Sequence, residues 1–520
     1  MGIGITIQND LLHFSIDFFP FKLYTISMCG IVGIFSKRPV TNELYEGLIN
    51  LQHRGQDAAG IVTFNGKFNV ARGKGFVREA FDEESLANLH GTIGIAHTRY
   101  ATTGSAFNLG NAQPFLVNSP YGIALIHNGN LTNYQQLRRE LQENEHFHCN
   151  SDSDTEALLG ILATELRKAS GHPDFFTVLS AAVKNVFKRA NGAYSVVGII
   201  AGKGLFVFRD PHGIRPLVYG VRQNIDGQKE YIFSSENTMY TLLGFSLVGD
   251  VGPGELMFVD MDGKLRSEKL ASAEFTPDAF EYIYFARSDA LINQVSVYRA
   301  RLRMGQNMAR NWKKLHPDLT PDLVVPVPFT SNPIALAFAH EIGVRYSEAI
   351  YRNSFIGRTF IMPGSETRQT AVRRKLSPQM IELAGKDVVI VDDSIVRGTT
   401  SREVIRMVRE AGAKKVYFLS MCPPLRYPDF YGIDIPTREE LISARLSDEE
   451  VCKFIGADIL MFQTVEDLSE AIMRRGEHHI SRLSMPYFNG EYITGDVDEQ
   501  FMETIRQARS QERVEDQDRK

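Results

Sequence analysis

The stretch VVIVDDSIVRGTTS, at residues 388–401, combines residue types that suit the binding of a sugar phosphate. Its first four residues are apolar and predict a buried parallel strand, and the apolar spacing after the stretch predicts a helix. In the loop between them, Gly398 lets the backbone approach a ligand closely, and the hydroxyls and amides of residues 399–401 lie where a helix dipole favours an anion. Asp392 and Asp393 can accept hydrogen bonds from vicinal hydroxyls or hold a hydrated divalent metal. The stretch therefore predicts recognition of ribose 5-phosphate; an ordinary βα turn with a solvated acidic pair is the alternative.

The same stretch resembles the phosphoribosyl pyrophosphate (PRPP) motif of type I phosphoribosyltransferases, and its ending, IVRGTTS, is similar to the amidophosphoribosyltransferase branch. The resemblance implies that the two aspartates bind the ribose hydroxyls and magnesium, and that residues 394–401 hold the 5-phosphate. The PRPP-binding residues expected here are Asp392, Asp393, Ser394, Arg397, Gly398, Thr399, Thr400 and Ser401.

A second candidate for chemistry is the cysteine that opens the short apolar stretch CGIVGIF, at residues 29–35. If Cys29 is the first residue of the mature chain, it carries both a thiol nucleophile and a free α-amine. Such an amine has an ordinary pKa of about 7.7 to 8.0, so it can act as a base near neutral pH. Because Met28 directly precedes Cys29, we expect residues 1–28 to be an extension or propeptide that the mature enzyme lacks. A buried core cysteine after an internal methionine is the alternative reading of this stretch alone.

Four further motifs follow this cysteine in order. They are LQHRGQDAAG at residues 51–60, GIAHTRYAT at 94–102, LIHNGNL at 125–131 and NSDSDTE at 150–156. Together with CGIVGIF they resemble the class II glutamine amidotransferase domain, an amino-terminal nucleophile hydrolase with an αββα sandwich. The resemblance implies that Cys29 forms a glutamyl thioester and releases ammonia.

The residue types in these motifs suit the groups of glutamine. A planar guanidinium pairs bidentately with a carboxylate and an acid pairs with an ammonium, so Arg99 and Asp154 are the expected partners of the α-carboxylate and the α-ammonium. By the resemblance, Asn128 and the amide of Gly129 form the oxyanion hole for the tetrahedral intermediate. Asp152 competes with Asp154 for the ammonium, but SDTE aligns better with the pattern of the family.

Several other polar residues of the motifs could also serve the site. His53, His97 and His127 suggest a metal ligand or a base, but each lies beside a residue that the family pattern explains better, so structural or orienting roles are expected. Arg54 and Asp57, in HRGQD, are expected to order a loop near the glutamine pocket.

After a Pro/Asp break at residues 275–279, the aromatic stretch FEYIYFARSDA at 280–290 is expected to begin a second domain. Ammonia must travel between the two sites without becoming ammonium in water, so an apolar passage has a physical purpose. Tyr282, Tyr284 and Arg287 are the expected channel wall, although interdomain core packing explains most of the aromatic run.

The segment DLVVPVPFTSNPIALAFA, at residues 322–339, predicts a second parallel strand and a turn into a helix. In the family this turn binds pyrophosphate, and the resemblance implies that Ser331 joins Asp392 and Asp393 at the metal site. Many relatives carry an acidic residue where Phe329 stands, so an acidic contribution from that position is missing here.

Residues 351–376 form a polar stretch dense in arginine and flanked by Gly and Pro. A basic run is usually a solvated face, but this one resembles the flexible loop with which the family closes over PRPP, which predicts a mobile lid. The residues expected nearest the pyrophosphate, where positive charge stabilises the leaving group, are Arg358, Arg374 and Lys375. Two residues depart from a common Arg-Tyr pair of the family, Ser354 and Phe355.

Composition limits the possible classes of protein. The length of 520 residues predicts two large domains or more, and the net charge of -5 gives no polybasic footprint for nucleic acid. Residues 1–27 contain no apolar run of membrane-spanning length, so no membrane span is expected. Four cysteines without paired metal spacing favour a reducing cytoplasm. Some relatives hold an iron–sulfur cluster through four cysteines, but only Cys422 and Cys452 lie in this half, so no cluster is expected.

We therefore predict an αββα amino-terminal nucleophile hydrolase domain over residues 29–275, a parallel-sheet type I phosphoribosyltransferase domain over 280–470, and a segment with a charged tail over 471–520. The resemblance implies a glutamine-dependent transferase that makes 5-phosphoribosylamine, glutamate and pyrophosphate from PRPP, glutamine and water at the first committed step of purine biosynthesis. It also implies magnesium as cofactor, purine nucleotides as inhibitors, and a homodimer or homotetramer. The alternatives are another class II amidotransferase or a PRPP-binding regulator without catalysis.

Overall fold

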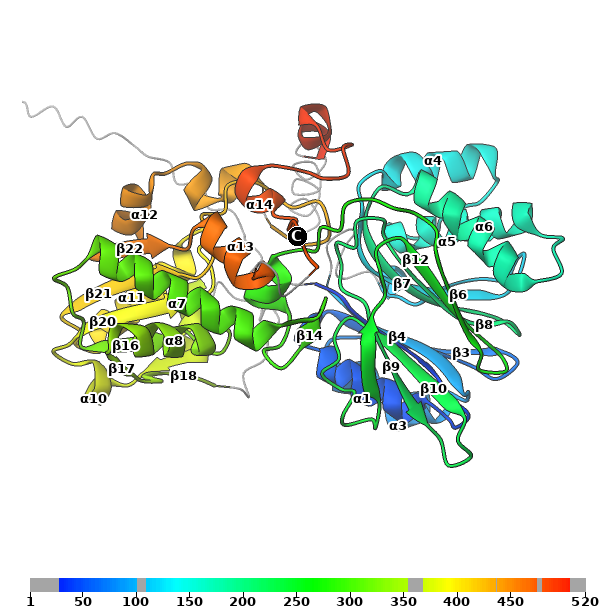
Figure 1. The fold of residues 1–520 in the computed structure, drawn as a ribbon, viewed down its shortest axis with the longest axis horizontal. Coiled ribbons are helices and arrows are strands. Elements are labelled where there is room, and N and C mark those ends of the chain that lie inside the picture. The colour runs from blue at the N-terminus through cyan, green and yellow to red at the C-terminus, as the bar shows by residue number, and fades with distance from the viewer. Residues whose placement is uncertain (1–27, 101–108, 354–367, 436, 475–478, 506–520) are drawn as a thin grey trace, which may run out of the picture.

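A computed structural model describes residues 28–100, 109–353, 368–435, 437–474 and 479–505 (Figure 1). Several predicted features lie outside these ranges: the proposed propeptide up to residue 27, the lid residues Ser354, Phe355 and Arg358, and the end of the charged tail. None of the helices in the described ranges combines the length and apolar composition needed to cross a membrane.

The amino-terminal half consists of two antiparallel sheets packed face to face, with helices on both outer faces (Figure 1). The first sheet has the order β11-β9-β10-β1-β4-β2-β3, and the second β13-β12-β8-β7-β6-β5. The strands of the first sheet are β1 (Gly30–Phe35), β2 (Ala58–Phe64), β3 (Phe68–Lys74), β4 (Ile93–Arg99), β9 (Val218–Gln223), β10 (Lys229–Ser234) and β11 (Ser246–Asp250). Those of the second are β5 (Phe115–Val117), β6 (Ile123–Leu131), β7 (Gly192–Ile200), β8 (Gly204–Arg209), β12 (Glu255–Asp260) and β13 (Leu265–Lys269).

Alternation along the strands explains this layering. In β1, Ile31 faces the other sheet with Val197 of β7, whereas Val32 packs with Leu44 and Leu48 of helix α1 (Thr41–Leu51). The second sheet is covered in the same way by α5 (Asp154–Ala169) and α6 (Phe175–Arg189), with α4 (Tyr134–Asn144) beside α5. The predicted αββα sandwich is confirmed.

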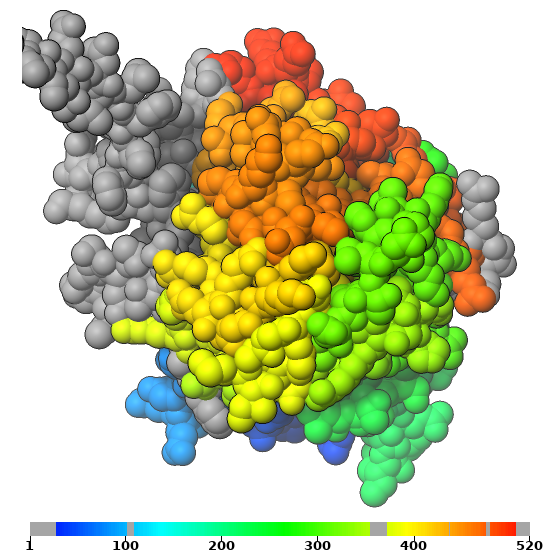
Figure 2. Space-filling view, turned by 90° about the vertical axis from the view of Figure 1, so that its left-hand side faces the viewer, coloured from blue at the N-terminus to red at the C-terminus, as the bar shows by residue number. Residues whose placement is uncertain are grey.

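The carboxyl-terminal half is built on a five-stranded parallel sheet of order β17-β16-β20-β21-β22. Its strands are β16 (Leu323–Pro326), β17 (Arg345–Tyr346), β20 (Asp387–Asp392), β21 (Lys415–Ser420) and β22 (Ile459–Phe462). Helices α7 (Val297–Leu315), α8 (Asn332–Ile342) and α13 (Val465–Met473) cover one face, and α11 (Thr399–Glu410) and α12 (Asp448–Ile455) cover the other. Figure 2 looks onto the outer side of this half, where the yellow and orange segments with α11 and α12 lie beside green α7. The predicted strand and helix around residue 398 and the predicted parallel sheet are confirmed, because Val389 and Val391 pack on one face while Val388 and Ile390 pack on the other.

Shorter elements connect these layers. In the amino-terminal half they are α2 (Val77–Ala80), α3 (Glu83–Ala87) and η1 (Leu109–Asn111). Later in the chain they are the π-helix η2 (Glu281–Phe285), β14 (Leu291–Ile292), β15 (Val295–Ser296), β18 (Ile350–Arg352), α9 (Arg368–Lys375), β19 (Leu376–Pro378), α10 (Met380–Leu383), η3 (Arg438–Glu440), η4 (Ile442–Ala444) and α14 (Pro486–Asn489).

The two halves share one hydrophobic core. Val32 and Leu48 of the first half belong to the same buried cluster as Phe280 and Tyr282 of the junction and Met304 of α7. The segment near α14 returns to this junction, where the amide of Ala279 donates to the carbonyl of Ser484 at 3.1 Å. The halves are therefore packed as one body at the junction, which places the glutamine motifs close to the second half.

Candidate active site

Cys29 lies directly before β1, at the inner edge of the first half. Its Sγ donates to the carbonyl oxygen of Tyr100 at 3.6 Å. The carbonyl oxygen of Cys29 accepts a hydrogen bond from Nε of Arg54 at 3.0 Å. Burial raises the pKa of the Cys29 thiol to about 11, although the bond to Tyr100 and the charge of Arg99 lower it. The thiol is therefore protonated at neutral pH and needs a base before it can attack.

The predicted oxyanion-hole residues lie at the end of β6. Asn128 is buried, and within the described part of the chain neither Nδ2 nor Oδ1 of its side chain has a hydrogen-bond partner. The neighbouring Gly129 has a φ of +145°, and a Cβ there would lie 1.9 Å from the carbonyl oxygen of Ala193, so only glycine fits. A buried amide donor without a partner costs free energy unless a ligand uses it, which suits a group that awaits a developing oxyanion.

Arg99 and Asp154 come together beside Cys29. Arg99 ends β4 and is buried; burial lowers its pKa, while the charges of Cys29, Asp57 and Asp154 raise it. Asp154 begins α5, is buried, and accepts a hydrogen bond from the amide of Leu131 at 3.0 Å. Its competitor Asp152 is exposed and faces Arg138 at 3.5 Å. The structure thus brings Asp154, rather than Asp152, to the charge cluster around Cys29.

Of the three histidines of the motifs, His53 and His127 have side-chain partners that suit structural or orienting roles. His127 binds the hydroxyl of Thr155 through Nδ1 at 2.9 Å, and His53 lies 2.9 Å from a carboxylate oxygen of Glu236. Burial lowers the pKa of both His97 and His127, so these two rings are neutral at pH 7. No group of three or more His, Cys, Asp or Glu side chains among the described residues could hold a metal ion.

Residues that sequence reasoning missed come from the second half and cover this site. A Cβ at Gly432 would lie 2.9 Å from the carbonyl carbon of Gly129, and Nδ2 of Asn130 donates to the carbonyl oxygen of Phe430 at 2.9 Å. The pattern PDFYGID at residues 428–434 contains a glycine between aromatic and acidic residues, and the φ of +109° at Gly432 explains why. This segment follows β21, which itself lies beside the strand of the acidic pair.

The acidic pair lies at the carboxyl end of β20, as predicted for a sugar phosphate site. The amide of Asp393 donates to Oδ1 of Asp392 at 2.9 Å, and the hydroxyl of Ser394 donates to Oδ1 of Asp393 at 2.7 Å. Burial and the neighbouring Asp393 raise the pKa of Asp392 well above its ordinary value, and burial raises the pKa of Asp393 to about 6. Two adjacent carboxylates in this position disfavour each other's ionisation, so a cation or hydroxyl donors would stabilise them.

The phosphate loop continues into the first turn of α11. Gly398 has a φ of +73° and directly precedes this helix, so Thr399, Thr400 and Ser401 form its first turn, where free amides favour an anion. Arg397 points to Glu440 instead, with Nε donating to Oε2 at 2.9 Å. The structure therefore brings the predicted loop residues together, with Arg397 held in an ion pair.

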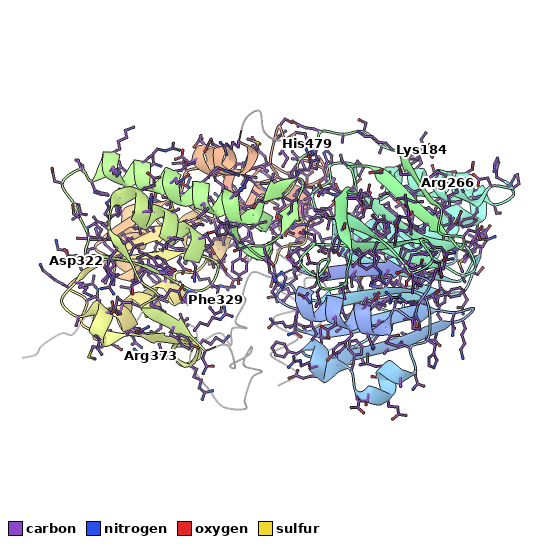
Figure 3. All side chains as sticks on the ribbon, turned by 60° about the horizontal axis from the view of Figure 1, so that its bottom comes forward. Lys184, Arg266, Asp322, Phe329, Arg373 and His479 are labelled. Atoms are coloured by element: carbon purple, nitrogen blue, oxygen red, sulfur yellow. The ribbon has the colours of Figure 1, made fainter. Side chains whose placement is uncertain are left out.

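Around this loop, the structure places the remaining predicted PRPP residues as follows. Ser331 precedes α8 and is fully buried, and its hydroxyl has no hydrogen-bond partner in the described ranges. Phe329 is 54% exposed, with the guanidinium carbon of Arg352 5.5 Å from its ring centroid, and Figure 3 shows it at the inner edge of the parallel-sheet half. Arg374 and Lys375 end α9, directly before the hairpin strand β19.

The three predicted channel residues all belong to the junction. Tyr282 is fully buried, and its hydroxyl accepts from Nδ2 of Asn293 at 3.0 Å. Tyr284 is half-buried and packs edge-to-face on Phe285. Arg287 pairs with Asp289 at 2.7 Å, while its amide donates to Glu236. These residues belong to the junction between the two halves, and their role as a channel wall stays a prediction.

Each half of the chain matches a known domain family. Residues 97–241 match the glutamine amidotransferase domain family and residues 295–427 match the phosphoribosyl transferase domain family. The chain is 46% identical over 485 residues to amidophosphoribosyltransferase from Pseudomonas aeruginosa, covering 93% of this chain and 96% of the relative. It is 43% identical to amidophosphoribosyltransferase from Saccharomyces cerevisiae, covering 93% and 95%.

A solved structure is also similar over almost its whole length. It is the glutamine PRPP amidotransferase from Bacillus subtilis complexed with ADP and GMP, with a TM-score of 0.79, 36% identity, and coverage of 91% of this chain and 98% of that one. The shared identity, the coverage and the two matched domain families agree with the geometry of both sites. The chain belongs to the amidophosphoribosyltransferase family.

Proposed function

We propose that this chain divides the reaction of its family between the two sites described above. PRPP, glutamine and water become 5-phosphoribosylamine, glutamate and pyrophosphate, the first committed step of purine biosynthesis. In this proposal, glutamine is cleaved at Cys29 and the ribose is substituted above the acidic pair of β20. The observation that carries the proposal is the buried side chain of Asn128, whose amide has no partner among the described residues and lies next to Gly129 at the end of β6.

At the first site, the buried charges fit the two ends of the amino acid. The guanidinium of Arg99 holds the α-carboxylate of glutamine and the carboxylate of Asp154 holds its α-ammonium. The side-chain amide then lies against Cys29. When the thiol attacks, the carbonyl oxygen gains negative charge and accepts hydrogen bonds from Nδ2 of Asn128 and the amide of Gly129.

The thiol needs a base because burial raises its pKa to about 11. Removal of residues 1–28 would free the α-amine of Cys29, which with a pKa of about 7.7 to 8.0 takes the thiol proton and returns it to the departing amide nitrogen. Water then cleaves the thioester and releases glutamate. No further base is required.

At the second site, the loop from Asp392 to Ser401 holds the ribose 5-phosphate of PRPP. The first-turn amides of α11 bind the 5-phosphate, and the carboxylates of Asp392 and Asp393 accept hydrogen bonds from the ribose hydroxyls. Arg358, Arg374 and Lys375 would neutralise the leaving pyrophosphate; Arg358 lies outside the described residues. Ammonia then displaces pyrophosphate at the anomeric carbon.

Magnesium fits the residues at this loop. The acidic pair offers oxygen ligands whose pKa values are raised mainly by burial, and the buried hydroxyl of Ser331 has no partner in the described ranges. Bound there, the ion would neutralise charge that develops on the pyrophosphate. No iron–sulfur cluster is part of the proposal.

The proposal also covers the path of ammonia, the inhibitors of the enzyme, its oligomeric state and its compartment. Tyr282, Tyr284 and Arg287 would border the path of ammonia. The Bacillus subtilis relative was complexed with ADP and GMP, which supports purine nucleotides as inhibitors of this chain. We also propose a homodimer or homotetramer, as in the family. Four free cysteines are in keeping with a reducing cytoplasm.

The test is a coupled measurement of products. With PRPP, magnesium and glutamine, the enzyme should form glutamate and phosphoribosylamine in equal amounts. Ammonium salts should replace glutamine as nitrogen source at alkaline pH, where free ammonia is abundant. Glutamate without phosphoribosylamine, or no PRPP consumption with either nitrogen source, would contradict the proposed function.

A further inference from the structure

The guanidinium of Arg54 is fully buried, and each of its nitrogens has a named partner. Nε donates to the carbonyl oxygen of Cys29 at 3.0 Å. Nη1 donates to Glu236 at 2.6 Å and to Glu281 at 2.9 Å, and Nη2 donates to the other oxygen of Glu281 at 2.6 Å. Arg54 thus binds Glu281 through Nη1 and Nη2, and it binds the backbone of Cys29 through Nε.

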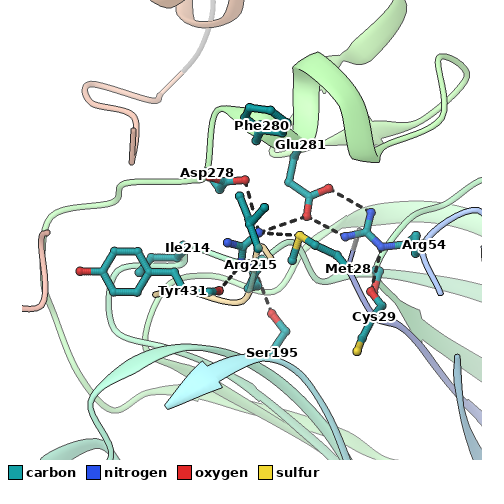
Figure 4. A network of polar contacts seen from close by, with 12 residues as sticks. Met28, Cys29, Arg54, Ser195, Ile214, Arg215, Asp278, Phe280, Glu281 and Tyr431 are labelled. Carbon is teal, nitrogen blue, oxygen red and sulfur yellow. Dashed lines mark hydrogen bonds and ion pairs between the residues drawn. The ribbon is translucent and has the colours of Figure 1, made fainter. Parts of the chain in front are cut away.

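The two carboxylates come from different halves of the chain. Glu236 follows β10 of the first half, whereas Glu281 is the first residue of η2, the π-helix of the junction that leads into the second half. Figure 4 shows Glu281 and Arg54 side by side, with the carbonyl of Cys29 against Arg54 and the thiol pointing away from it. The junction therefore reaches the nucleophile from its backbone side.

The hydrogen bond from Arg54 matters because Cys29 has few other hydrogen bonds with the described residues. The pairing of β1 with β4 begins at Gly30, and within the described ranges the hydrogen bond of the thiol is a long contact of 3.6 Å with the carbonyl oxygen of Tyr100. If Met28 is removed, Cys29 also loses the peptide bond that now ties its other side. Its carbonyl bond to Arg54 would then be a main restraint on the direction in which the thiol and the amine point.

The charges make the contact strong. Burial alone would lower the pKa of Arg54, but Glu281 and Glu236 raise it above its ordinary value. Burial raises the pKa of Glu236, but His53 and Arg54 lower it to about 2. Both groups are therefore ionised, and charge-assisted bonds between buried groups hold the guanidinium in one orientation.

We propose that Glu281 is a positioning residue for the nucleophile: it fixes Arg54, and Arg54 fixes Cys29. The functional glutamine site then extends past the predicted domain boundary at residue 275 and into η2. The proposal rests on the proposed function at Cys29 and adds a residue of the junction to it.

The experiment substitutes Glu281→Gln, which keeps the shape of the side chain and removes its charge. Glutamine-dependent kcat should fall about 10- to 100-fold, since a small misplacement of a reacting group has effects of this size, while the KM for glutamine changes little. Alkylation of Cys29 by iodoacetamide should slow as well. Ammonia-dependent consumption of PRPP should stay within about twofold of the parent, because the second site is untouched.

Glu274→Gln is the matched control. Glu274 lies seven residues earlier on the same connection, and its side chain is half-exposed in an ion pair with Arg482 at 3.2 Å. An exposed pair of this kind contributes little, so all of these rates should stay within about twofold of the parent. Arg54→Lys and the double variant with Glu281→Gln complete a cycle in which the two effects on glutamine-dependent kcat should be clearly non-additive.

Should Glu281→Gln fail to fold, the variant Arg54→Met/Glu281→Leu replaces this buried pair by apolar groups, while Glu236 keeps its contacts with His53 and with the amide of Arg287. It should lose glutamine-dependent activity and keep ammonia-dependent activity. Unchanged glutamine-dependent kcat in Glu281→Gln, or an equal fall of both activities, would overturn the positioning role. Absence of ammonia-dependent activity in the parent enzyme would instead contradict the proposed function.

Discussion

The two sites of this chain differ in the signs of the charges that they bury. Around Cys29, charges of opposite sign lie together: Arg54 binds Glu236 and Glu281, and Arg99 lies near Asp154. At the end of β20, two charges of the same sign, Asp392 and Asp393, lie next to each other, and the pKa of each is raised.

The difference indicates how each site is completed. The glutamine site is preorganised, because charges of opposite sign lie together there without substrate and the neutral amide of Asn128 is among the polar groups without a partner in the described residues. At the PRPP loop, the charges of Arg301 and Arg352 lower the pKa of Asp393, but burial keeps the pKa of both aspartates raised, so a cation and ribose hydroxyls would stabilise their ionised forms. Substitutions at the first site should therefore mainly lower rates, whereas neutralising an acid at the second should weaken binding and stabilise the empty fold.

The largest expected effect comes from removing the nucleophile. Cys29→Ala should abolish glutamine-dependent formation of phosphoribosylamine, by about 10³-fold or more, and leave ammonia-dependent formation near that of the parent. The measurement is the rate of PRPP consumption with each nitrogen source. Substantial glutamine-dependent activity in this variant would remove Cys29 from the mechanism.

The next effect tests preorganisation itself. Asn128→Ala should lower glutamine-dependent kcat by about 10²- to 10³-fold with little change in the KM for glutamine, because the lost donor acts on the oxyanion and not on the substrate. Steady-state kinetics separate the two constants, with the exposed Asn88→Ala as control. A rise in KM without a fall in kcat would assign Asn128 to substrate binding instead.

At the PRPP loop, Asp392→Asn should act in two directions. The KM for PRPP should rise about tenfold, because one ligand of the ribose and the ion loses its charge. The melting temperature of the unliganded enzyme should rise by a few degrees, since the neutral amide removes a costly buried like charge. Calorimetry without ligands measures this melting temperature, with the exposed Asp318→Asn as control. A lower melting temperature would show that Asp392 and Asp393 do not destabilise the unliganded fold.

The smallest expected effect is on stability and concerns Asp278, because burial raises its pKa to about 7. Because the unfolded group titrates near 3.9 and the folded group near 7, the folded chain binds the proton more tightly. The stability that this group supports is present below about pH 4 and is lost as the pH rises toward 7. In Asp278→Asn, the fall in the free energy of unfolding between pH 4 and 8 should be smaller, by about 1 kcal/mol or more. Denaturant titrations across this range measure it, and an unchanged pH dependence would contradict the raised pKa.

Local patterns allowed much of both sites to be predicted from the sequence. The strand, loop and helix around Gly398 lie within a few residues of one another, so apolar runs and a glycine suffice to place Asp392 and the first turn of α11. CGIVGIF and LIHNGNL predicted Cys29 and Asn128 in the same way. Their roles in catalysis remain predictions.

What the sequence did not predict depends on contacts between distant residues. Arg54 was expected only to order a loop, because its partners Glu236 and Glu281 lie 182 and 227 residues away. The approach of Gly432 to Gly129 is equally remote in sequence. Pairings of this kind leave no local pattern, since they arise only when the second half packs on the first.

The most direct test of the account is the start of the active chain, because a protonated buried thiol requires the free amine of Cys29. Intact mass and amino-terminal sequencing of enzyme purified from its own host, together with a glutaminase assay on the same sample, supply it. Active protein should begin at Cys29. Retention of Met1 or Met28 in protein that hydrolyses glutamine at full rate would contradict it.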